Sequence, residues 1–286
     1  MKNNFAVFIL TFGRHDRVFT IDTLRKMGYT GKIYLICSTD DVQLPLYQKK
    51  YGDDVLVFSK DEMRGTFDMA DNFPEQNSVI FARNINNEFA KKLGIRYYCQ
   101  MDDDYTHFQY KIPTNKALRS PSVRGFDDIF DIYVEALKSM PSVQGLAFAQ
   151  GGDLIGGKDN PLFTKAHEWR KRKQMNCYIR DVERDYQFFG RGNDDVNCYV
   201  VNGKNGMVFL THPFVIMVQP LTQSNEGGLT DFYKEYGTYV KSFYTILFQP
   251  SAVSIKTMGR KHRRLHHSIS WKNAIPCIIP EYFKKF

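Results

Sequence analysis

The sequence predicts an α/β protein whose central sheet is doubly wound, with a parallel part at its N-terminal end. Two observations lead to this fold class. Over residues 1–100, apolar runs of strand length alternate with segments of helical periodicity, several of which end at glycine. The apolar runs are continuous, as in strands that are covered on both faces. Sheets of this kind bind ligands at the carboxyl ends of their strands.

Four strands and three helices are expected in the first part of the chain. The strands are expected at residues 5–12, 32–37, 55–60 and 97–101. The intervening helices are expected at residues 15–31, 45–53 and 84–95. Gly31 and Gly94 mark two of the helix ends, because glycine readily adopts the conformation that stops a helix.

The pattern changes after residue 113. Helices are expected at residues 126–140, 195–206 and 227–248, and strands at residues 143–150, 175–181, 207–211 and 214–219. The first of these strands is expected to break into a glycine-rich hairpin at residues 151–157. The glycine spacing there fits neither a phosphate-binding loop nor a dinucleotide fingerprint.

The two parts are expected to form one domain over residues 1–286. No linker rich in proline, serine or glycine separates them, and no internal repeat is present. Residues 1–112 would form a nucleotide-binding half, and residues 113–286 an acceptor half with a basic C-terminal segment.

Composition excludes several classes of protein. The chain is 43% hydrophobic and 24% charged, which is typical of globular proteins. No apolar run is long enough to span a bilayer, and the apolar N-terminus is interpreted as a strand rather than a signal peptide. The five cysteines are scattered without a CxxC pair, which favours neither zinc nor disulfides. A cytoplasmic protein without a membrane partner is expected.

The net charge of +8 is concentrated near the C-terminus. Residues 251–286 contain eight lysines and arginines and a single acid, Glu281, and a second basic cluster lies at residues 167–174. Such clusters favour a polyanionic partner, with nucleic acid the commonest case. The alternative is that both are solvated surfaces without a partner.

Chemically capable side chains follow three of the four predicted N-terminal strands. They are Thr11, Gly13 and Arg14 after the first strand, Asp40 and Asp41 after the second, and Asp102, Asp103 and Asp104 after the fourth. Because the carboxyl ends of parallel strands meet at one edge of the sheet, these residues are expected to converge there. Three converging strand ends indicate a site.

The three aspartates suggest a site for a divalent cation. In an extended chain Asp102 and Asp104 point to one side and Asp103 to the other. Two carboxylates on one side suit Mg²⁺ or Mn²⁺, which complete their shells with water and substrate phosphates. Asp103 is expected to point away from the metal, as part of a solvated turn, so that Asp103→Asn should have little effect. The alternative is that all three form a solvated acidic turn.

The chain resembles the GT-A glycosyltransferases, and more closely the phage-type TET/JBP-associated glycosyltransferases, over nearly its whole length. The segments that carry this resemblance are FGRHDRVFTIDTLRKMGYTGKIYL, FARNINNEFAKKLG, QMDDDYTHFQYK, AQGGDLIGG, GRGNDDVNCYV, TQSNEGGLTDFYKEYGTYVKSFYTILFQPS and HRRLHHSISWKNAIP. The resemblance implies a GT-A-type mixed sheet, a UDP-sugar donor and Mn²⁺ or Mg²⁺. It implies an acceptor, the hydroxymethyl group of 5-hydroxymethylcytosine or another hydroxymethylpyrimidine in DNA, made by a TET-like dioxygenase acting upstream. A phage-encoded member would act in the host cytoplasm.

The resemblance also implies roles for individual residues in donor binding. The nucleotide pocket would include Thr11, Phe12, Gly13, Arg14, Asp103 and Arg260. Either Asp40 or Asp41 would bind the base or ribose, the other serving as a helix cap. Arg83 would bind a phosphate or a donor hydroxyl, or else form a surface salt bridge.

The remaining implied roles concern catalysis and the metal. Asp195, with Asp194 as the second choice, would accept the proton of the attacking hydroxyl in an inverting reaction. In a retaining reaction these acids would instead orient the acceptor. His266 or His267 would join Asp102 and Asp104 as a metal ligand. The two histidines are adjacent, so only one of them can face the metal in an extended segment.

Two other functions are compatible with the sequence. One is a GT-A enzyme that acts on a glycan, a lipid-linked sugar or a protein, with its basic tail against an anionic membrane. The other, of a different class, is an inert nucleic-acid-binding protein on a GT-A scaffold.

Overall fold

The computed structural model describes residues 4–73, 78–172, 174–175, 177–219, 237, 239–259 and 263–284. Its strands are β1 Phe5–Leu10, β2 Lys32–Ser38, β3 Val55–Phe58, β4 Tyr97–Asp102, β5 His107–Tyr110, β6 Ile112–Pro113, β7 Leu118–Arg119, β8 Val143–Ala149, β9 Cys177–Asp181, β10 Val208–Val218, β11 Val253–Met258 and β12 Arg264–Ile269. Its α-helices are α1 Phe19–Lys26, α2 Leu44–Tyr51, α3 Ile80–Lys92, α4 Phe126–Ser139, α5 Asp194–Lys204, α7 Val240–Phe248 and α8 Trp271–Ala274. Short 3₁₀ turns are η1 Gly52–Asp54, η2 Gly151–Leu154, η3 Gly157–Asp159, η4 Pro161–Phe163, η5 Ala166–Lys171 and η6 Glu281–Lys284.

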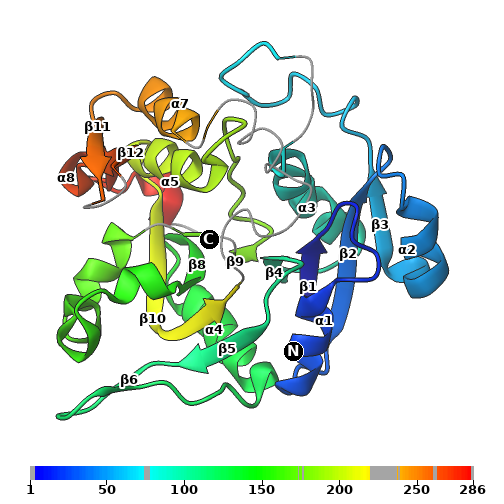
Figure 1. The fold of residues 1–286 in the computed structure, drawn as a ribbon, viewed down its shortest axis with the longest axis horizontal. Coiled ribbons are helices and arrows are strands. Elements are labelled where there is room, and N and C mark those ends of the chain that lie inside the picture. The colour runs from blue at the N-terminus through cyan, green and yellow to red at the C-terminus, as the bar shows by residue number, and fades with distance from the viewer. Residues whose placement is uncertain are drawn as a thin grey trace.

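The centre of the fold is an eight-stranded mixed sheet with the order β3-β2-β1-β4-β9-β8-β10-β5 (Figure 1). The strands β3, β2, β1 and β4 are parallel to one another. Strand β9 runs antiparallel to both β4 and β8, and β5 runs antiparallel to β10. The expected doubly wound mixed α/β sheet is therefore confirmed, and it contains strands from both halves of the chain.

Helices cover both faces of the sheet because its strands are apolar on both sides. In β1, Val7 and Ile9 pack with residues of α1, α2 and α4, whereas Ala6 and Phe8 pack with residues of α3 and α5. All of β1 is buried, as its unbroken apolar sequence predicts. This double cover fixes the parallel strands, so their carboxyl ends form a stable platform.

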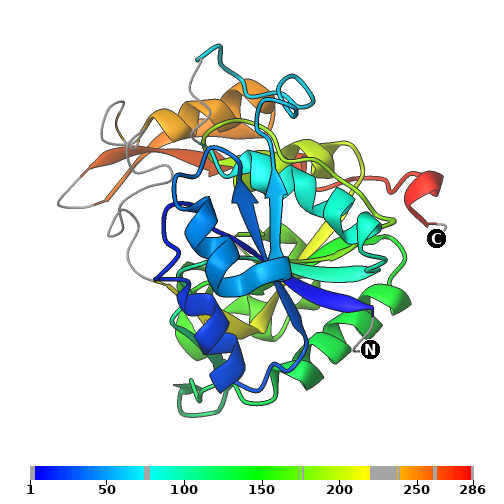
Figure 2. The same cartoon turned by 90° about the vertical axis from the view of Figure 1, so that its right-hand side faces the viewer.

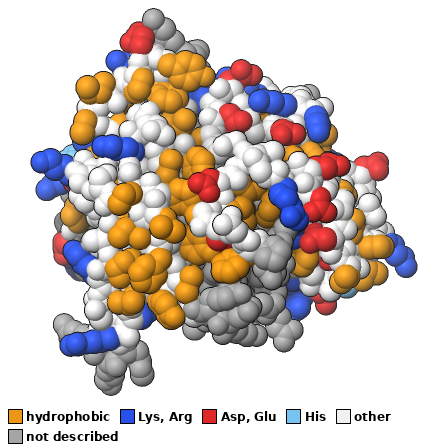
Figure 3. Space-filling model, turned by 90° about the horizontal axis from the view of Figure 1, so that it is seen from above, with side chains coloured by type: hydrophobic (Ala, Val, Ile, Leu, Met, Phe, Trp, Pro, Cys, Tyr) orange, Lys and Arg blue, Asp and Glu red, His pale blue; other side chains and the backbone are white. Residues whose placement is uncertain are grey.

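Two small ribbons form two-stranded sheets of their own, separate from the central sheet. Strands β11 and β12 form an antiparallel hairpin that projects from the body beside α7 (Figure 2). Strands β6 and β7 form a second antiparallel pair (Figure 1). Hydrophobic side chains gather on the left of the face seen in Figure 3. On α7, Phe243 and Leu247 are exposed. No helix of the described part of the chain is long and apolar enough to cross a membrane.

Three sequence predictions about local structure were wrong. Residues 151–157 form 3₁₀ turns instead of a hairpin, because the Asp153 carboxylate accepts the Gln150 N–H at 2.9 Å and so closes the turn. The two strands expected within residues 207–219 are the single strand β10, with a register shift between His212 and Ile216. Pro213, which lacks an N–H group, lies at this shift.

The third error concerns the start of a helix. Helix α3 begins at Ile80 instead of residue 84, so Arg83 lies within its first turn. This places the Arg83 side chain, which is 3% exposed, between the helix and the sheet.

Candidate functional site

The ends of β1, β2 and β4 meet at one edge of the sheet, as the sequence predicted. Thr11 Oγ1 donates a hydrogen bond to Asp103 Oδ2 at 2.7 Å, which joins the end of β1 to the turn after β4. The backbone N–H of Gly13 donates to Asp41 Oδ2 at 2.7 Å, which joins β1 to the turn after β2. Gly13 has a φ of +68°, a conformation that costs glycine little, so the loop can bend toward Asp41.

Tyr47 is a member of this loop system that sequence reasoning missed. Its hydroxyl lies 2.7 Å from Thr11 Oγ1 and accepts the Arg14 N–H at 2.8 Å. Burial raises the pKa of the Tyr47 hydroxyl, which therefore remains protonated and neutral. Its position on α2 gave no signal, because a tyrosine in an amphipathic helix normally indicates core packing.

Asp103 is not part of a solvated turn, and that expectation was wrong. Its carboxylate is 2% exposed in the folded chain. Besides the bond from Thr11, it accepts a charge-assisted hydrogen bond from Arg14 Nη1 at 2.8 Å. The prediction assumed an extended strand, in which successive side chains point to opposite sides. That assumption does not hold here, because β4 ends at Asp102 and both Asp103 and Asp104 lie in a turn. Asp103 therefore holds the loop after β1 in place.

Asp103→Asn is consequently expected to matter more than the sequence suggested. The amide still fits the space, but it lacks the charge that pairs with Arg14, so the free energy of unfolding should fall by about 1–3 kcal/mol. Urea unfolding of the variant measures this, with the exposed Asp131→Asn on α4 as the matched control. Equal midpoints for the two variants would contradict the structural role of Asp103.

Asp40 and Asp41 have different environments. Asp41 is buried, and both of its carboxylate oxygens accept backbone N–H groups: besides the bond from Gly13, the second oxygen accepts the Gln43 N–H at 2.8 Å. The Asp40 side chain is half exposed and accepts from Lys60 Nζ at 2.9 Å. The ammonium of Lys60 also lies 4.5 Å from the centre of the Phe12 ring. Of the two aspartates, Asp40 is the one with surface left for a ligand.

Lys60 was missed, although a signal existed. It follows β3, the remaining parallel strand, so the rule that selected the other strand ends also selects it. Phe12, which is 37% exposed, presents an open ring beside Lys60 and Asp40.

Arg83 connects the two acidic segments of the sequence. Its Nε lies 2.6 Å from Asp194 Oδ2 at the start of α5, and its Nη2 lies 3.7 Å from Asp102 Oδ1 at the end of β4. The guanidinium also lies over the rings of Tyr178 and Phe188, at 5.1 and 5.5 Å from their centres. The interpretation of Arg83 as part of a surface salt bridge is therefore wrong.

Burial and mutual repulsion dominate the electrostatics of these acids. Burial raises the pKa of Asp102 to about 7; Arg83 lowers it, and the neighbouring aspartates Asp103, Asp104 and Asp194 raise it. Burial likewise raises the pKa of Asp194 to about 6, against the lowering effect of Arg83. The site thus concentrates negative charge that a cationic group would stabilise.

Arg83→Met should destabilise the fold in a pH-dependent way. In the wild type, folded Asp194 keeps its proton up to about pH 6, whereas an unfolded aspartate loses it near 3.8. Its contribution to stability therefore falls as the pH rises from about 4 to 6. Removing the guanidinium raises this pKa further, so we expect a loss of about 3–5 kcal/mol at neutral to alkaline pH and a smaller loss near pH 5.

Urea unfolding of Arg83→Met at two pH values tests this expectation. Lys91→Met, an exposed substitution near the end of the same helix, is the control. A loss that is equal at both pH values would show that Arg83 acts through packing alone.

Asn193, Asp194 and Asp195 join the C-terminal elements to this site. Both aspartates lie in the first turn of α5, and Asp195 Oδ1 accepts the Val196 N–H at 2.8 Å. Asn193 has a φ of +58°, and its side-chain amide bonds to Thr245 on α7. The same amide lies 3.0 Å from His267 Nδ1 on β12.

His267, rather than His266, faces the acidic segment. His267 is buried and lies beside Asn193, whereas His266 is only partly buried. The two imidazole rings lie close together, with their centres 4.2 Å apart.

The described residues fit a divalent cation that takes few protein ligands. Asp102 Oδ1 is buried and accepts no hydrogen bond within the described part of the chain. No three histidines, cysteines, aspartates or glutamates among the described residues are grouped to hold a metal by themselves. Two carboxylates with a substrate diphosphate satisfy Mg²⁺ or Mn²⁺, whereas a structural metal needs a fuller set of ligands.

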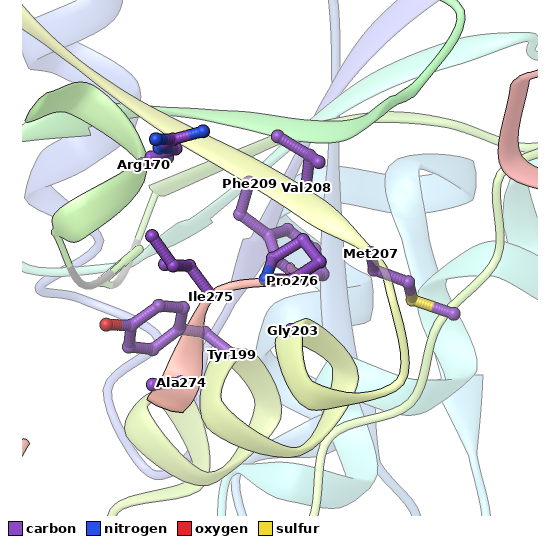
Figure 4. Close-up of a pocket in the computed structure, with 9 residues that line it drawn as sticks. All are labelled: Arg170, Tyr199, Gly203, Met207, Val208, Phe209, Ala274, Ile275 and Pro276. Atoms are coloured by element: carbon purple, nitrogen blue, oxygen red, sulfur yellow. The ribbon is translucent and has the colours of Figure 1, made fainter. Parts of the chain in front are cut away.

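Some candidate residues fall elsewhere. Arg260 and the first part of the helix expected at residues 227–248 lie outside the described residues. A small pocket lies between α5, β10 and α8, toward the C-terminal end of α5 and so away from its aspartates (Figure 4). Gly203 and Ala274 line it, and a Cβ atom at Gly203 would come within 2.4 Å of the Ala274 carbonyl oxygen. The pocket therefore lies where packed elements meet, and none of the candidate site residues named above lines it.

Comparisons with known proteins give a family and a set of similar folds. No curated protein matches the chain. Among solved structures it is similar to glucosyl-3-phosphoglycerate synthase from Mycobacterium tuberculosis in complex with Mn²⁺ and UDP-glucose, with 9% identity, coverage of 93% of this chain and 86% of that chain, and a TM-score of 0.47. It is also similar to S. aureus TarS 1-349, with 10% identity, coverage of 85% and 65%, and a TM-score of 0.39. The sequence model of the family described as TET-Associated Glycosyltransferase matches residues 5–228. The chain therefore belongs to the TET-associated glycosyltransferases, a family of sugar-transferring enzymes.

Proposed function

We propose that this enzyme transfers a sugar from a UDP-sugar to the hydroxymethyl group of 5-hydroxymethylcytosine, or of another hydroxymethylpyrimidine, in DNA. The observation that carries the proposal is the convergence of the ends of β1, β2 and β4, joined by hydrogen bonds to Asp103 and Asp41, beside the acidic turn at residues 102–104 in a member of this family. A TET-like dioxygenase acting earlier would supply the acceptor, because oxidation of a 5-methyl group creates the hydroxyl.

Each part of the site has a role in this reaction. Asp102 and Asp104, with His267 or His266, would hold Mn²⁺ or Mg²⁺, which when bound neutralises charge on the departing diphosphate. The loop at residues 11–14 would bind the nucleotide, with Phe12 against the base and Asp40 near the base or ribose. Asp103 and Asp41 keep this loop in its shape.

The residues that would activate the acceptor lie in the first turn of α5. Asp195 would accept the proton of the acceptor's hydroxymethyl group. The hydroxymethyl oxygen would form a bond to the anomeric carbon of the sugar while the bond between that carbon and UDP breaks. Asp194, paired with Arg83, is the second choice for this role. In a retaining reaction the two carboxylates would orient the acceptor.

The basic C-terminal hairpin supports a DNA acceptor. Cross-strand pairing places Lys256 opposite His266 and Met258 opposite Arg264, so these side chains share one face of the hairpin. In the same hairpin Val253 and His267 are buried. A cationic face next to the site suits phosphate contacts that position a duplex.

The test is direct. The purified chain is incubated with Mn²⁺, a panel of UDP-sugars and duplex DNA containing 5-hydroxymethylcytosine, and the nucleosides are identified by mass. We expect a hexosyl or related mass increase on the modified nucleoside. If UDP is released but the modified nucleoside is unchanged, DNA is not the acceptor. The protein would then be a glycosyltransferase that acts on another class of acceptor.

A further inference from the structure

An arm-like ribbon begins immediately after the acidic turn of the site. We define the arm as residues 106–124, which include β5, β6 and β7 and project from the body at the lower left of Figure 1. Within it, Ile112 pairs with Arg119 and Pro113 with Leu118. At its root, β5 pairs with β10 at the edge of the central sheet. The arm therefore extends from the sheet edge only two residues beyond Asp104.

One face of the arm fixes it to the body. Leu118 packs against a satellite core that includes Leu154, Leu162 and Ile216. On the same face, Lys111 Nζ donates to Gln109 Oε1 at 3.0 Å and to Ser120 Oγ at 2.7 Å, which ties the two strands together. The ribbon thus has its own internal support, and its opposite face points outward with Arg119 exposed.

The arm is strongly basic. The sequence contains no acidic residue between Asp104 and Asp127, but it contains Lys111, Lys116, Arg119 and Arg124. The last three are exposed, and none of the four forms a salt bridge with any residue that the structure describes. Neighbouring cations without acids repel one another, so this surface is suited to a polyanion.

We propose that the arm binds the phosphate backbone of duplex DNA next to the target base. This inference rests on the proposed function and names the surface that holds its acceptor. A two-stranded ribbon fits the major groove of B-DNA, about 12 Å wide, and the 5-substituent of a pyrimidine lies in that groove.

Phosphates of DNA account for the arm better than a lipid surface does. The connection between β6 and β7, residues 114–117, is Thr-Asn-Lys-Ala and carries no aromatic or large apolar side chain. On the outward face of the arm, Ile112 is exposed beside Arg119. Segments that insert into a membrane interface need several large apolar or aromatic side chains, so one isoleucine among these cations does not suffice. Contact with DNA phosphates requires only the cations and polar groups that are present.

The experiment compares two variants of equal charge. The arm variant is Lys116→Gln, Arg119→Gln and Arg124→Gln, which spares Lys111 and its hydrogen bonds. The control variant is Lys26→Gln, Lys49→Gln and Lys91→Gln, exposed lysines in or near the last turns of α1, α2 and α3. Affinity for an unmodified duplex is measured from low to physiological salt. UDP-sugar hydrolysis and binding to phosphatidylserine vesicles are measured alongside.

We expect the arm variant to bind duplex DNA roughly a hundredfold more weakly. Its salt slope should fall by about 0.9 for each DNA phosphate that the arm no longer neutralises. The control variant should keep a larger affinity and slope, and both should hydrolyse UDP-sugar at the wild-type rate.

Three results would decide against one or the other proposal. Equal DNA affinity and slope in the two variants would overturn the arm inference, whether or not the wild type glycosylates DNA. Loss of vesicle binding without loss of DNA binding would overturn it in favour of a lipid surface. A wild type that binds DNA through the arm but leaves 5-hydroxymethylcytosine unchanged would refute the proposed acceptor alone.

Discussion

Asp104→Ala is expected to lower kcat/KM for sugar transfer by roughly a thousandfold or more while leaving the fold intact. Asp104 follows β4 in a turn and is only partly buried, so its loss creates no large cavity. Its carboxylate would be one of the two aspartate ligands of the divalent cation. Weakening a Lewis acid that neutralises the leaving diphosphate removes several kcal/mol from the stabilisation of the transition state.

The measurement separates chemistry from folding. Mn²⁺ binding by calorimetry and transfer kinetics are compared for Asp104→Ala and the exposed Asp131→Ala on α4. The first should bind Mn²⁺ weakly in the presence of UDP and the second should bind it like the wild type, with similar thermal midpoints for both. Transfer by Asp104→Ala at a near wild-type rate would remove Asp104 from the metal site.

The position of the site could be predicted from the sequence because it depends on short-range patterns. Continuous apolar runs identified β1, β2 and β4, and the carboxyl ends of parallel strands meet by topology alone. The same rule applied to β3 would also have found Lys60. Each of these inferences needs only the strand and the few residues at its carboxyl end.

The inner arrangement of the site could not be predicted in this way. Whether Asp103 points to solvent depends on where β4 ends, which is decided by the hydrogen bonds from Thr11 and Arg14. The link from Arg83 to Asp194 joins helices more than a hundred positions apart in the chain. Such contacts are set by how α3 and α5 share one face of the sheet.

Asp195→Asn should lower kcat by about 10²–10⁴-fold with little change in KM for DNA. A general base must be able to reach the hydroxyl group of the acceptor. Asp194 and Asp195 differ in this respect, because their carboxylates have different partners. Asp194 Oδ2 lies 2.6 Å from the buried guanidinium of Arg83. Asp195 Oδ1 accepts the Val196 N–H of its own helix, and among the described residues its second oxygen accepts no hydrogen bond. The asparagine amide matches the shape of the aspartate but cannot accept the proton.

Asp194→Asn is the matched comparison, because it removes one charge from the neighbouring residue. It deprives Arg83 of its closest countercharge, so we expect mainly a loss of about 3 kcal/mol in stability, with a smaller fall in kcat at temperatures where the variant is folded. Transfer to 5-hydroxymethylcytosine DNA and urea unfolding are measured for both variants. If Asp194→Asn lost more of kcat than Asp195→Asn, the base would be Asp194. If neither lowered kcat, the carboxylates would orient the acceptor instead, as expected for a reaction that retains the configuration of the sugar.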